Sequence, residues 1–436
     1  MRFCLAILAT AWVGCSSATV GSEGGDAGAG NSAGKGGAAS GGTSTSTSGG
    51  ASASAGYGGS AGDSAGGSGT AGASGGGGKM GSGGIVGAGG TTSGSCGSIP
   101  APGTWDAASI SPVASPPGIP GYQFTGKSVS VVVDPFDTAK VWLGTGEYGL
   151  YQSTDCGASW VHVSTGTDSD QIDRSTLWSM AVDPVNQGTI YTVAAYGAGS
   201  VWKSTNGGLD WVDLFPSQTG FQYNFANNIS MDAHDPLHLV TMSHGSCDDF
   251  SNGCLTETFD GGETWPNRVS LPKPWGERGG VDVVDATTWI LGYGGDGMYV
   301  TTDNGQTWTQ AIEKGAGDAS GEFSTLPLAP AADGAYYVDS FQGALRSTDG
   351  VNWSLVWAKK DGISARLEAL ITTPTTIYAG DYADIYSAPL SDYGNWTKIT
   401  GPALENFFNT FMAYDSVHKI VYVSGWEGGM VRYVEP

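Results

Sequence analysis

The sequence has few basic residues and no long apolar run. Of 436 residues, 18 are Lys or Arg and 41 are Asp or Glu, which gives a formal net charge of -23. An acidic protein repels phosphate backbones, so we expect no nucleic-acid partner. The apolar run at residues 3–13 is too short to cross a bilayer, and no later run is longer. The sequence therefore predicts no membrane-spanning helix.

The first 15 residues have the pattern of an export signal. One basic residue, Arg2, precedes the apolar run, which leads to Gly14 and Cys15. The Gly-Cys pair resembles a bacterial lipoprotein signal, in which Cys15 becomes the lipidated first residue. The alternative is an ordinary secretory signal that is cleaved nearby. We expect an exported protein in a bacterial cell envelope, or a secreted one, that contacts a membrane only through this lipid.

Residues 16–95 contain almost no large side chains and consist mainly of Gly, Ser, Ala and Thr. Such a composition buries too little apolar area to offset the entropy of ordering, so we predict a disordered linker. A flexible chain of this length has a root-mean-square reach of roughly 50 Å. That reach suits a tether between a membrane and a folded domain at residues 96–436.

After the linker, the sequence repeats a unit of four short strands. The first strand of each unit is a short apolar run, followed by a turn, a second strand, a Gly-rich loop and a third strand. These first strands are expected at residues 129–133, 177–182, 229–233, 281–284, 323–328, 367–371 and 411–414. A fourth strand begins at Trp160, Trp211, Trp265, Trp308, Trp353 and Trp396, which gives a period of roughly 43 to 54 residues.

The connection before each Trp is a recurring turn. It reads hydroxyl residue, spacer, Asp or Asn, spacer, Gly, spacer, hydroxyl-like residue, Trp, as in residues 301–308. The Asp or Asn side chain can accept hydrogen bonds from the following amides, and Gly permits positive φ. The carboxylate or amide of the turn is contributed by Asp155, Asn206, Asp260, Asp303 and Asp349. We assign these five residues a structural role.

Four-stranded units at this period predict an all-β, seven-bladed β-propeller. The seventh unit, residues 411–434, has only three strands. Its missing strand has a candidate near the start of the folded region, where Gly103-Thr104-Trp105 matches the end of the repeat. We therefore predict a single propeller that an N-terminal strand closes.

The six cysteines fit an oxidising compartment. Cys4 lies in the signal and Cys15 would carry the lipid. Cys247 and Cys254 bracket an insertion and could pair, which would leave Cys96 to pair with Cys156. Sequence alone permits three connectivities of these four residues.

The repeat resembles the Asp-box, or bacterial neuraminidase repeat, of sialidases, sortilin-type receptors and xyloglucan-cleaving glycoside hydrolases. The resemblance covers roughly residues 100–436 and implies a propeller more firmly than any activity. It also implies that the turns lie on one face, so that the opposite face is the likelier binding surface. We expect a monomer.

On that opposite face, aromatic and polar residues in loops suit a sugar or protein ligand. An aromatic ring offers a flat apolar surface, and charged or amide groups pair with hydroxyls. The candidate ligand-binding residues are Tyr148, Trp275, Arg278, Tyr382 and Trp426. The alternative is that several of these aromatics pack between blades.

Glycoside hydrolysis would require two carboxyl groups that flank one bond, about 5 to 10 Å apart. Candidates are Glu147 and Glu427, which lie in neighbouring units, and Asp296 and Asp381. No set is compelling, so the first interpretation is binding of a polysaccharide or surface protein without catalysis. A glycoside hydrolase is the alternative, and an envelope assembly scaffold is a third.

We expect no cofactor and no metal. The folded region has no phosphate-cradling loop and no nucleotide fingerprint. His234 and His238 have a spacing that zinc sites use, but Pro236 between them indicates a turn rather than a helix.

Overall fold

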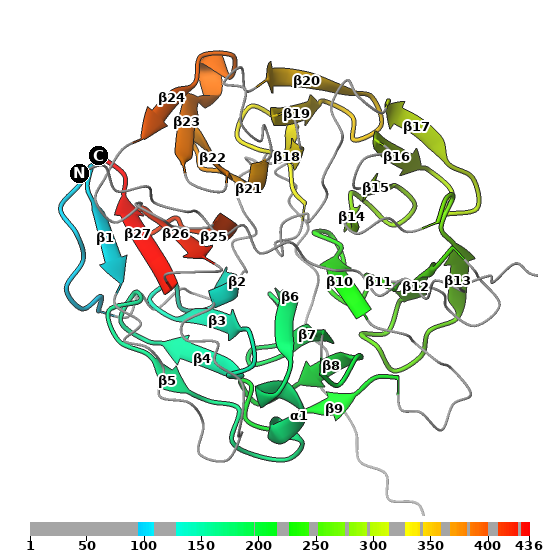
Figure 1. Ribbon diagram of the computed structural model, residues 1–436, viewed down its shortest axis with the longest axis horizontal. Helices are drawn as coiled ribbons and strands as arrows, with labels where there is room; N and C mark the ends of the chain where they lie inside the picture. The colour runs from blue at the N-terminus through cyan, green and yellow to red at the C-terminus, as the bar shows by residue number, and fades with distance from the viewer. Residues whose placement is uncertain are drawn as a thin grey trace, which may run out of the picture. The chain divides into compact units, whose positions relative to one another are not determined.

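The computed structural model describes thirteen segments of the chain, and all of them belong to the second of its two compact units, Gly77–Pro436. The segments are residues 95–108, 128–195, 197–215, 226–243, 252–274, 279–293, 297–313, 328–340, 343–358, 367–381, 384–399, 409–425 and 429–436. They form seven antiparallel sheets around a ring, as Figure 1 shows. The prediction of a seven-bladed β-propeller is confirmed.

Blades 1 to 3 each have four strands. Blade 1 consists of β2 (Ser128–Val133), β3 (Val141–Thr145), β4 (Leu150–Ser153) and β5 (Val161–His162). Blade 2 consists of β6 (Thr176–Val182), β7 (Ile190–Ala195), β8 (Val201–Ser204) and β9 (Val212–Asp213). Blade 3 consists of β10 (Ala226–Met231), β11 (Leu239–Ser243), β12 (Cys254–Thr258) and β13 (Asn267–Ser270).

Blades 4 to 6 continue the ring. Blade 4 consists of β14 (Gly279–Val283), β15 (Trp289–Tyr293), β16 (Gly297–Thr301) and β17 (Thr309–Ile312). Blade 5 shows β18 (Tyr336–Ser340), β19 (Gly343–Ser347) and β20 (Trp353–Ala358), and residues 323–327 of its predicted first strand lie outside the described residues. Blade 6 consists of β21 (Leu367–Thr372), β22 (Thr376–Asp381), β23 (Ile385–Pro389) and β24 (Thr397–Ile399).

Blade 7 joins the two ends of the folded region. It consists of β25 (Asn409–Asp415), β26 (Ile420–Gly425), β27 (Gly429–Val434) and the N-terminal β1 (Trp105–Ala108). Strand β1 is antiparallel to β27, with Trp105 opposite Tyr433, and the two rings stack 4.8 Å apart. The predicted closure by the N-terminal strand is confirmed.

The hydrophobic core is divided among the blade interfaces. The described residues form seven buried clusters, each of which combines side chains from two neighbouring blades. Hydroxyl groups also join the innermost strands: Ser130 donates to the carbonyl of Leu177 at 2.8 Å, and Ser179 donates to that of Ile229 at 3.1 Å. These bonds satisfy polar groups that the ring buries.

Helix is scarce in the described part of the chain. It contains α1 (Ser169–Asp173), between blades 1 and 2, and the 3-10 turn η2 (Leu390–Asp392) in blade 6. Among these residues, no helix has the length and apolarity needed to cross a membrane.

The recurring turns have the geometry that their chemistry predicts. In blade 4, Thr301 donates to the carboxylate of Asp303 at 2.8 Å, and the amide and hydroxyl of Thr307 donate to it at 2.8 and 2.7 Å. These hydrogen bonds lower the pKa of Asp303. Gly305 has a φ of 77°, and its carbonyl accepts from the indole of Trp308 at 3.0 Å. Related bonds hold the turns of Asp155, Asn206, Asp260 and Asp349.

A disulfide joins the start of the folded region to blade 1. Cys96 and Cys156 are bonded, as one of the three possible connectivities requires. Cys254 is also disulfide-bonded. Its predicted partner, Cys247, lies outside the described residues, so that pairing remains a prediction.

Candidate functional site

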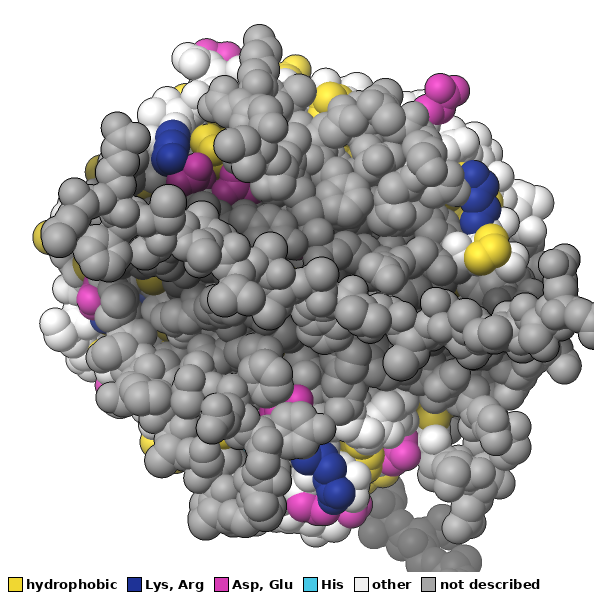
Figure 2. Space-filling model, in the orientation of Figure 1, with side chains coloured by type: hydrophobic (Ala, Val, Ile, Leu, Met, Phe, Trp, Pro, Cys, Tyr) yellow, Lys and Arg dark blue, Asp and Glu magenta, His cyan; other side chains and the backbone are white. Residues whose placement is uncertain are grey.

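The strand order gives the propeller two different faces. The connections between first and second strands and the recurring turns lie on one face, which we call the turn face. The hairpins between second and third strands and the links between blades lie on the other, the loop face. Around the margin of the face seen in Figure 2, acidic and basic side chains of the described residues lie next to one another. One exposed ion pair, between Asp170 and Arg174, lies at α1.

Glu147 and Tyr148 lie in the hairpin between β3 and β4 of blade 1. Glu147 has a φ of 71°, and its amide donates to the carbonyl of Ser175 at 2.9 Å, which ties this hairpin to blade 2. Tyr148 is only 5% exposed and belongs to the core between blades 1 and 7. For Tyr148 the structure shows the packing alternative that the sequence left open.

Asp381 ends β22 in blade 6 and is 2% exposed. Its carboxylate accepts from the amide of Asp384 at 2.7 Å, so it shapes the hairpin to β23. Blade 7 separates it from the hairpin of Glu147. The other predicted site residues lie outside the described residues: Cys15, Trp275, Arg278, Asp296, Tyr382, Trp426 and Glu427.

Two buried carboxyl groups of neighbouring blades influence each other. Asp282 on β14 is 1% exposed and Asp339 on β18 is 2% exposed. Burial, and then the negative charge of Asp339, raise the pKa of Asp282 well above its usual value. The hydroxyl of Ser230, 3.5 Å from Asp282, only partly opposes this shift. A carboxyl group that stays protonated beside a second carboxyl group can donate a proton in acid–base chemistry.

Sequence reasoning missed this pair because it searched the loops. Asp282 interrupts the apolar run at residues 281–284, and Asp339 lies near the end of the strand-like stretch at residues 336–340. An acidic residue within a strand that is otherwise apolar was the available signal, because burying such a group is costly.

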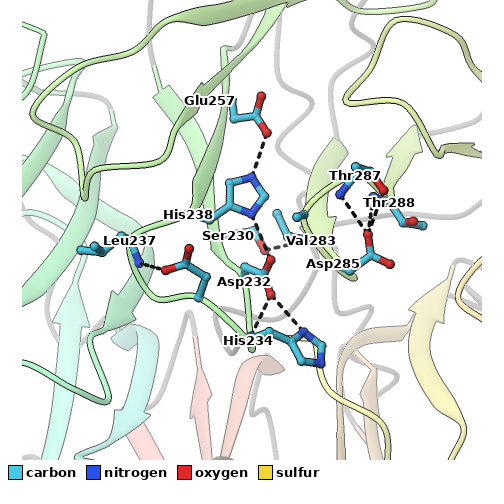
Figure 3. Close-up of polar contacts among 12 residues, drawn as sticks. Ser230, Asp232, His234, Leu237, His238, Glu257, Val283, Asp285, Thr287 and Thr288 are labelled. Atoms are coloured by element: carbon cyan, nitrogen blue, oxygen red, sulfur yellow. Dashed lines mark hydrogen bonds and ion pairs between the residues drawn. The ribbon is translucent and has the colours of Figure 1, made fainter.

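A second buried set of titratable groups lies in blade 3 (Figure 3). His238 is 1% exposed, and its ring nitrogens lie 3.1 Å from a carboxylate oxygen of Asp232 and 2.8 Å from one of Glu257. Burial alone would lower the pKa of His238, but hydrogen bonds to both carboxylates outweigh it and raise the pKa to about 9. Asn267 and Asn304 also donate to Glu257. All these contacts are internal, so we assign the set a structural role.

The described residues bring together one group of potential metal ligands, Cys96, Cys156 and His418. The two cysteines form a disulfide and offer no thiolate, so this group does not suit a metal. His234 and His238 both bind Asp232 rather than facing a common ligand position.

No family model matches the sequence. The chain is 24% identical over 255 residues to the "Probable oligoxyloglucan-reducing end-specific xyloglucanase" of Neosartorya fischeri. It is 24% identical over 308 residues to a xyloglucanase of Hypocrea jecorina, and 25% identical over 206 residues to one of Acetivibrio thermocellus. These alignments cover 46%, 60% and 41% of this chain, but only 29%, 36% and 24% of the relatives. The chain thus spans little more than a third of the relatives' length at most.

Solved structures of similar fold include YCF48 from Cyanidioschyzon merolae, with a TM-score of 0.50 and 13% identity. That match covers 72% of this chain and 97% of YCF48. The extracellular domain of a hybrid two component system from B. thetaiotaomicron matches with a TM-score of 0.51 and 12% identity, over 70% of this chain and 40% of that one. At such identities the likeness shows the fold alone. The class defined so far is a single seven-bladed propeller with low sequence similarity to xyloglucanases.

Proposed function

We propose that this propeller binds a polysaccharide of the xyloglucan type. The observation that carries the proposal is the sequence similarity to three xyloglucanases, which reaches across 60% of the chain in the longest alignment. The acidic composition favours a neutral or basic ligand over a nucleic acid. The proposal rests on this sequence similarity and not on the arrangement of the predicted ligand-binding residues, most of which lie outside the described residues.

A second candidate function is hydrolysis of that polysaccharide, which the pair formed by Asp282 and Asp339 favours. Glycoside hydrolysis uses one protonated and one ionised carboxyl group. The raised pKa of Asp282 supports the acid role, and Asp339 on the neighbouring blade would be the ionised partner. Both groups are buried, so a polymer would reach them only after local opening of the surrounding chain.

The export pattern at residues 1–15 supports a location outside the cytoplasm, with the lipid on Cys15 and residues 16–95 as the tether. Such an arrangement would hold a monomeric propeller at the cell surface, where polymers are accessible.

Affinity electrophoresis of the full-length chain in gels containing xyloglucan tests binding, with dextran gels as the control. Retardation by xyloglucan alone is expected. Equal mobility in both gels would overturn the proposal and leave a protein partner, such as an envelope assembly, as the next class to test.

Release of reducing sugar from xyloglucan tests the second candidate function. Hydrolysis that Asp282→Asn abolishes, while retardation in the gel persists, would support it. Retardation without any sugar release would leave binding alone.

A further inference from the structure

Among the described residues, three pairs of neighbouring blades are joined on the turn face by a polar contact, which we call the clasp. In blade 2, Lys203 lies opposite Tyr191 in the pairing of β7 with β8. Its ammonium donates to the carbonyl of Gly261, the fourth residue of the turn in blade 3, at 2.9 Å. The Tyr191 hydroxyl donates to the same carbonyl at 3.1 Å.

The clasp recurs at other junctions with different chemistry. Between blades 7 and 1, the guanidinium of Arg432 donates to the carbonyl of Cys156 at 2.7 Å. Between blades 3 and 4, the side chain of Asn304 donates to the carboxylate of Glu257 at 2.8 Å. Cys156 and Asn304 are each the fourth residue of their turn, as Gly261 is. At these three junctions the fourth residue of the turn therefore joins neighbouring blades.

The junction between blades 1 and 2 lacks the clasp. Gln152 lies opposite Trp142, as Lys203 lies opposite Tyr191, and the fourth residue of the next turn is Gly207. Among the described residues, no side chain donates to the Gly207 carbonyl, and Gln152 makes no side-chain hydrogen bond. The Trp142 indole donates instead within its own blade, to Asp134 at 3.2 Å.

A hollow of about 570 Å³ opens at this junction. Its volume lies within the range of ligand pockets, roughly 300 to 1,000 Å³. The walls come from both blades and include the residues Lys140, Gln152, Gln187, Thr205 and Leu209. Trp142 also borders the hollow, but it is only 1% exposed, and the ammonium of Lys140 lies 5.7 Å from the centre of its ring.

The lining suits an uncharged ligand that both donates and accepts hydrogen bonds. Within the described part of the chain, the side chains of Gln187 and Thr205 bond to no other group, so with Gln152 they offer two carboxamides and a hydroxyl. The one ammonium, Lys140, lies 3.7 Å from Asp134, which offsets its charge. A polyol such as a sugar matches this set better than an anion or a metal cation.

We propose that this hollow is a binding site for one or two rings of a neutral sugar. The proposal rests on the proposed function and deepens it, because it places a sugar contact on the turn face, away from the loop-face residues predicted from the sequence.

The test compares the full-length wild-type chain with Gln152→Lys. The new lysine should reach the Gly207 carbonyl as Lys203 reaches Gly261, and so fill the hollow without breaking the fold. Lys203→Gln is the matched control, since it removes a clasp at the next junction and leaves the hollow intact. Ligand-observed NMR with cellobiose reports binding, and glucuronate is the anionic comparison.

We expect cellobiose to bind the wild type and Lys203→Gln, and Gln152→Lys to weaken that binding by about tenfold, the effect of losing one or two hydrogen bonds. Equal binding to wild type and Gln152→Lys would overturn the proposal, as would binding of glucuronate alone. Electrophoresis in xyloglucan separates this from the proposed function. If xyloglucan retards the protein but Gln152→Lys binds cellobiose as the wild type does, only the sugar site in the hollow is refuted. If cellobiose binding depends on Gln152 but xyloglucan causes no retardation, only the proposed binding of xyloglucan is refuted.

Discussion

The imidazole of His238 and the carboxylate of Glu257 lie 2.8 Å apart and are both 1% exposed. Asp232 binds the other ring nitrogen, so one cation is held between two anions inside blade 3. A histidine in such a setting makes the stability of the protein depend on pH.

We predict that the free energy of unfolding falls as the pH rises through the folded pKa of His238. The pKa of His238 is about 9 in the folded protein against an ordinary value of 6.5, so the folded state binds the proton more tightly. The stabilisation is complete below pH 6.5 and is lost above pH 9, by about 3 kcal/mol. Urea titrations between pH 6 and 10 measure it.

His238→Gln should flatten the dependence of the free energy of unfolding on pH. His234→Gln changes an exposed histidine that also contacts Asp232 and should leave this pH dependence unchanged. Direct titration of the His238 ring by NMR covers the case in which His238→Gln fails to fold. A ring pKa near 6.5 would contradict the prediction.

Asp282→Asn should stabilise the protein at pH 7 or leave it unchanged. Burial and the charge of Asp339 raise the pKa of Asp282, so ionising it in the folded state costs free energy. Because the folded state holds this proton more tightly, Asp282 makes the free energy of unfolding fall as the pH rises above its unfolded pKa. The asparagine side chain of Asp282→Asn does not ionise, so this pH dependence is lost. Thermal unfolding from pH 4 to 7 measures the slope.

Asp339→Asn is the matched variant for this experiment. It should lower the pKa of Asp282 by removing the neighbouring charge, and so reduce the slope without removing it. A loss of stability in Asp282→Asn at pH 7 would show that the carboxylate is needed in its ionised form.

Lys203→Met should lower the free energy of unfolding by about 1 to 2 kcal/mol, because it removes a charged hydrogen bond to the Gly261 carbonyl. The side chain of Lys203 is 17% exposed, so solvent replaces little of that bond. Lys398→Met is the control: its ion pair with Asp384 is half exposed on the lysine side and should contribute well under 1 kcal/mol. Equal losses in urea unfolding would argue against a special role for the clasp.

Removing the disulfide should destabilise the propeller strongly. The bond between Cys96 and Cys156 spans 60 residues, and a loop of that length corresponds to about 4 kcal/mol in the chain-entropy treatment. The free energy of unfolding should fall by similar amounts in Cys96→Ser and in the double variant Cys96→Ser/Cys156→Ser, since each removes the same bond. Denaturant unfolding with and without a reductant checks this. If a reductant destabilises the double variant as much as it destabilises the wild type, the effect comes from another disulfide, such as the one formed by Cys254.

The sequence predicted the ring because the repeat is local. Each turn needs only its own Asp or Asn, its Gly and the following Trp, so five copies, and a sixth Trp at the same spacing, were visible without any knowledge of contacts. Closure by β1 was also predictable, because Trp105 repeats the Trp of the other units and the last unit lacked a strand.

The candidate sites were harder to predict because they depend on contacts between blades. No feature of the sequence around Asp282 indicates that it interacts with Asp339, which lies on β18 of the next blade. Likewise, Gln152 and Lys203 look equally polar in sequence, and only the pairing of strands shows that they occupy equivalent positions. Tyr148 shows the reverse case, since its loop position suggested exposure and the neighbouring blade buries it.

The bond between Cys96 and Cys156 also decides where a mechanical load would enter the propeller. Strand β1 is paired with β27 over only four residues and would be the weakest point if the chain were pulled from its N-terminal side. Because Cys96 precedes β1 and is joined covalently to blade 1, such a pull passes into the body of the ring before it reaches that strand. A propeller held by its N-terminal segment could therefore resist shear flow without peeling open at its seam.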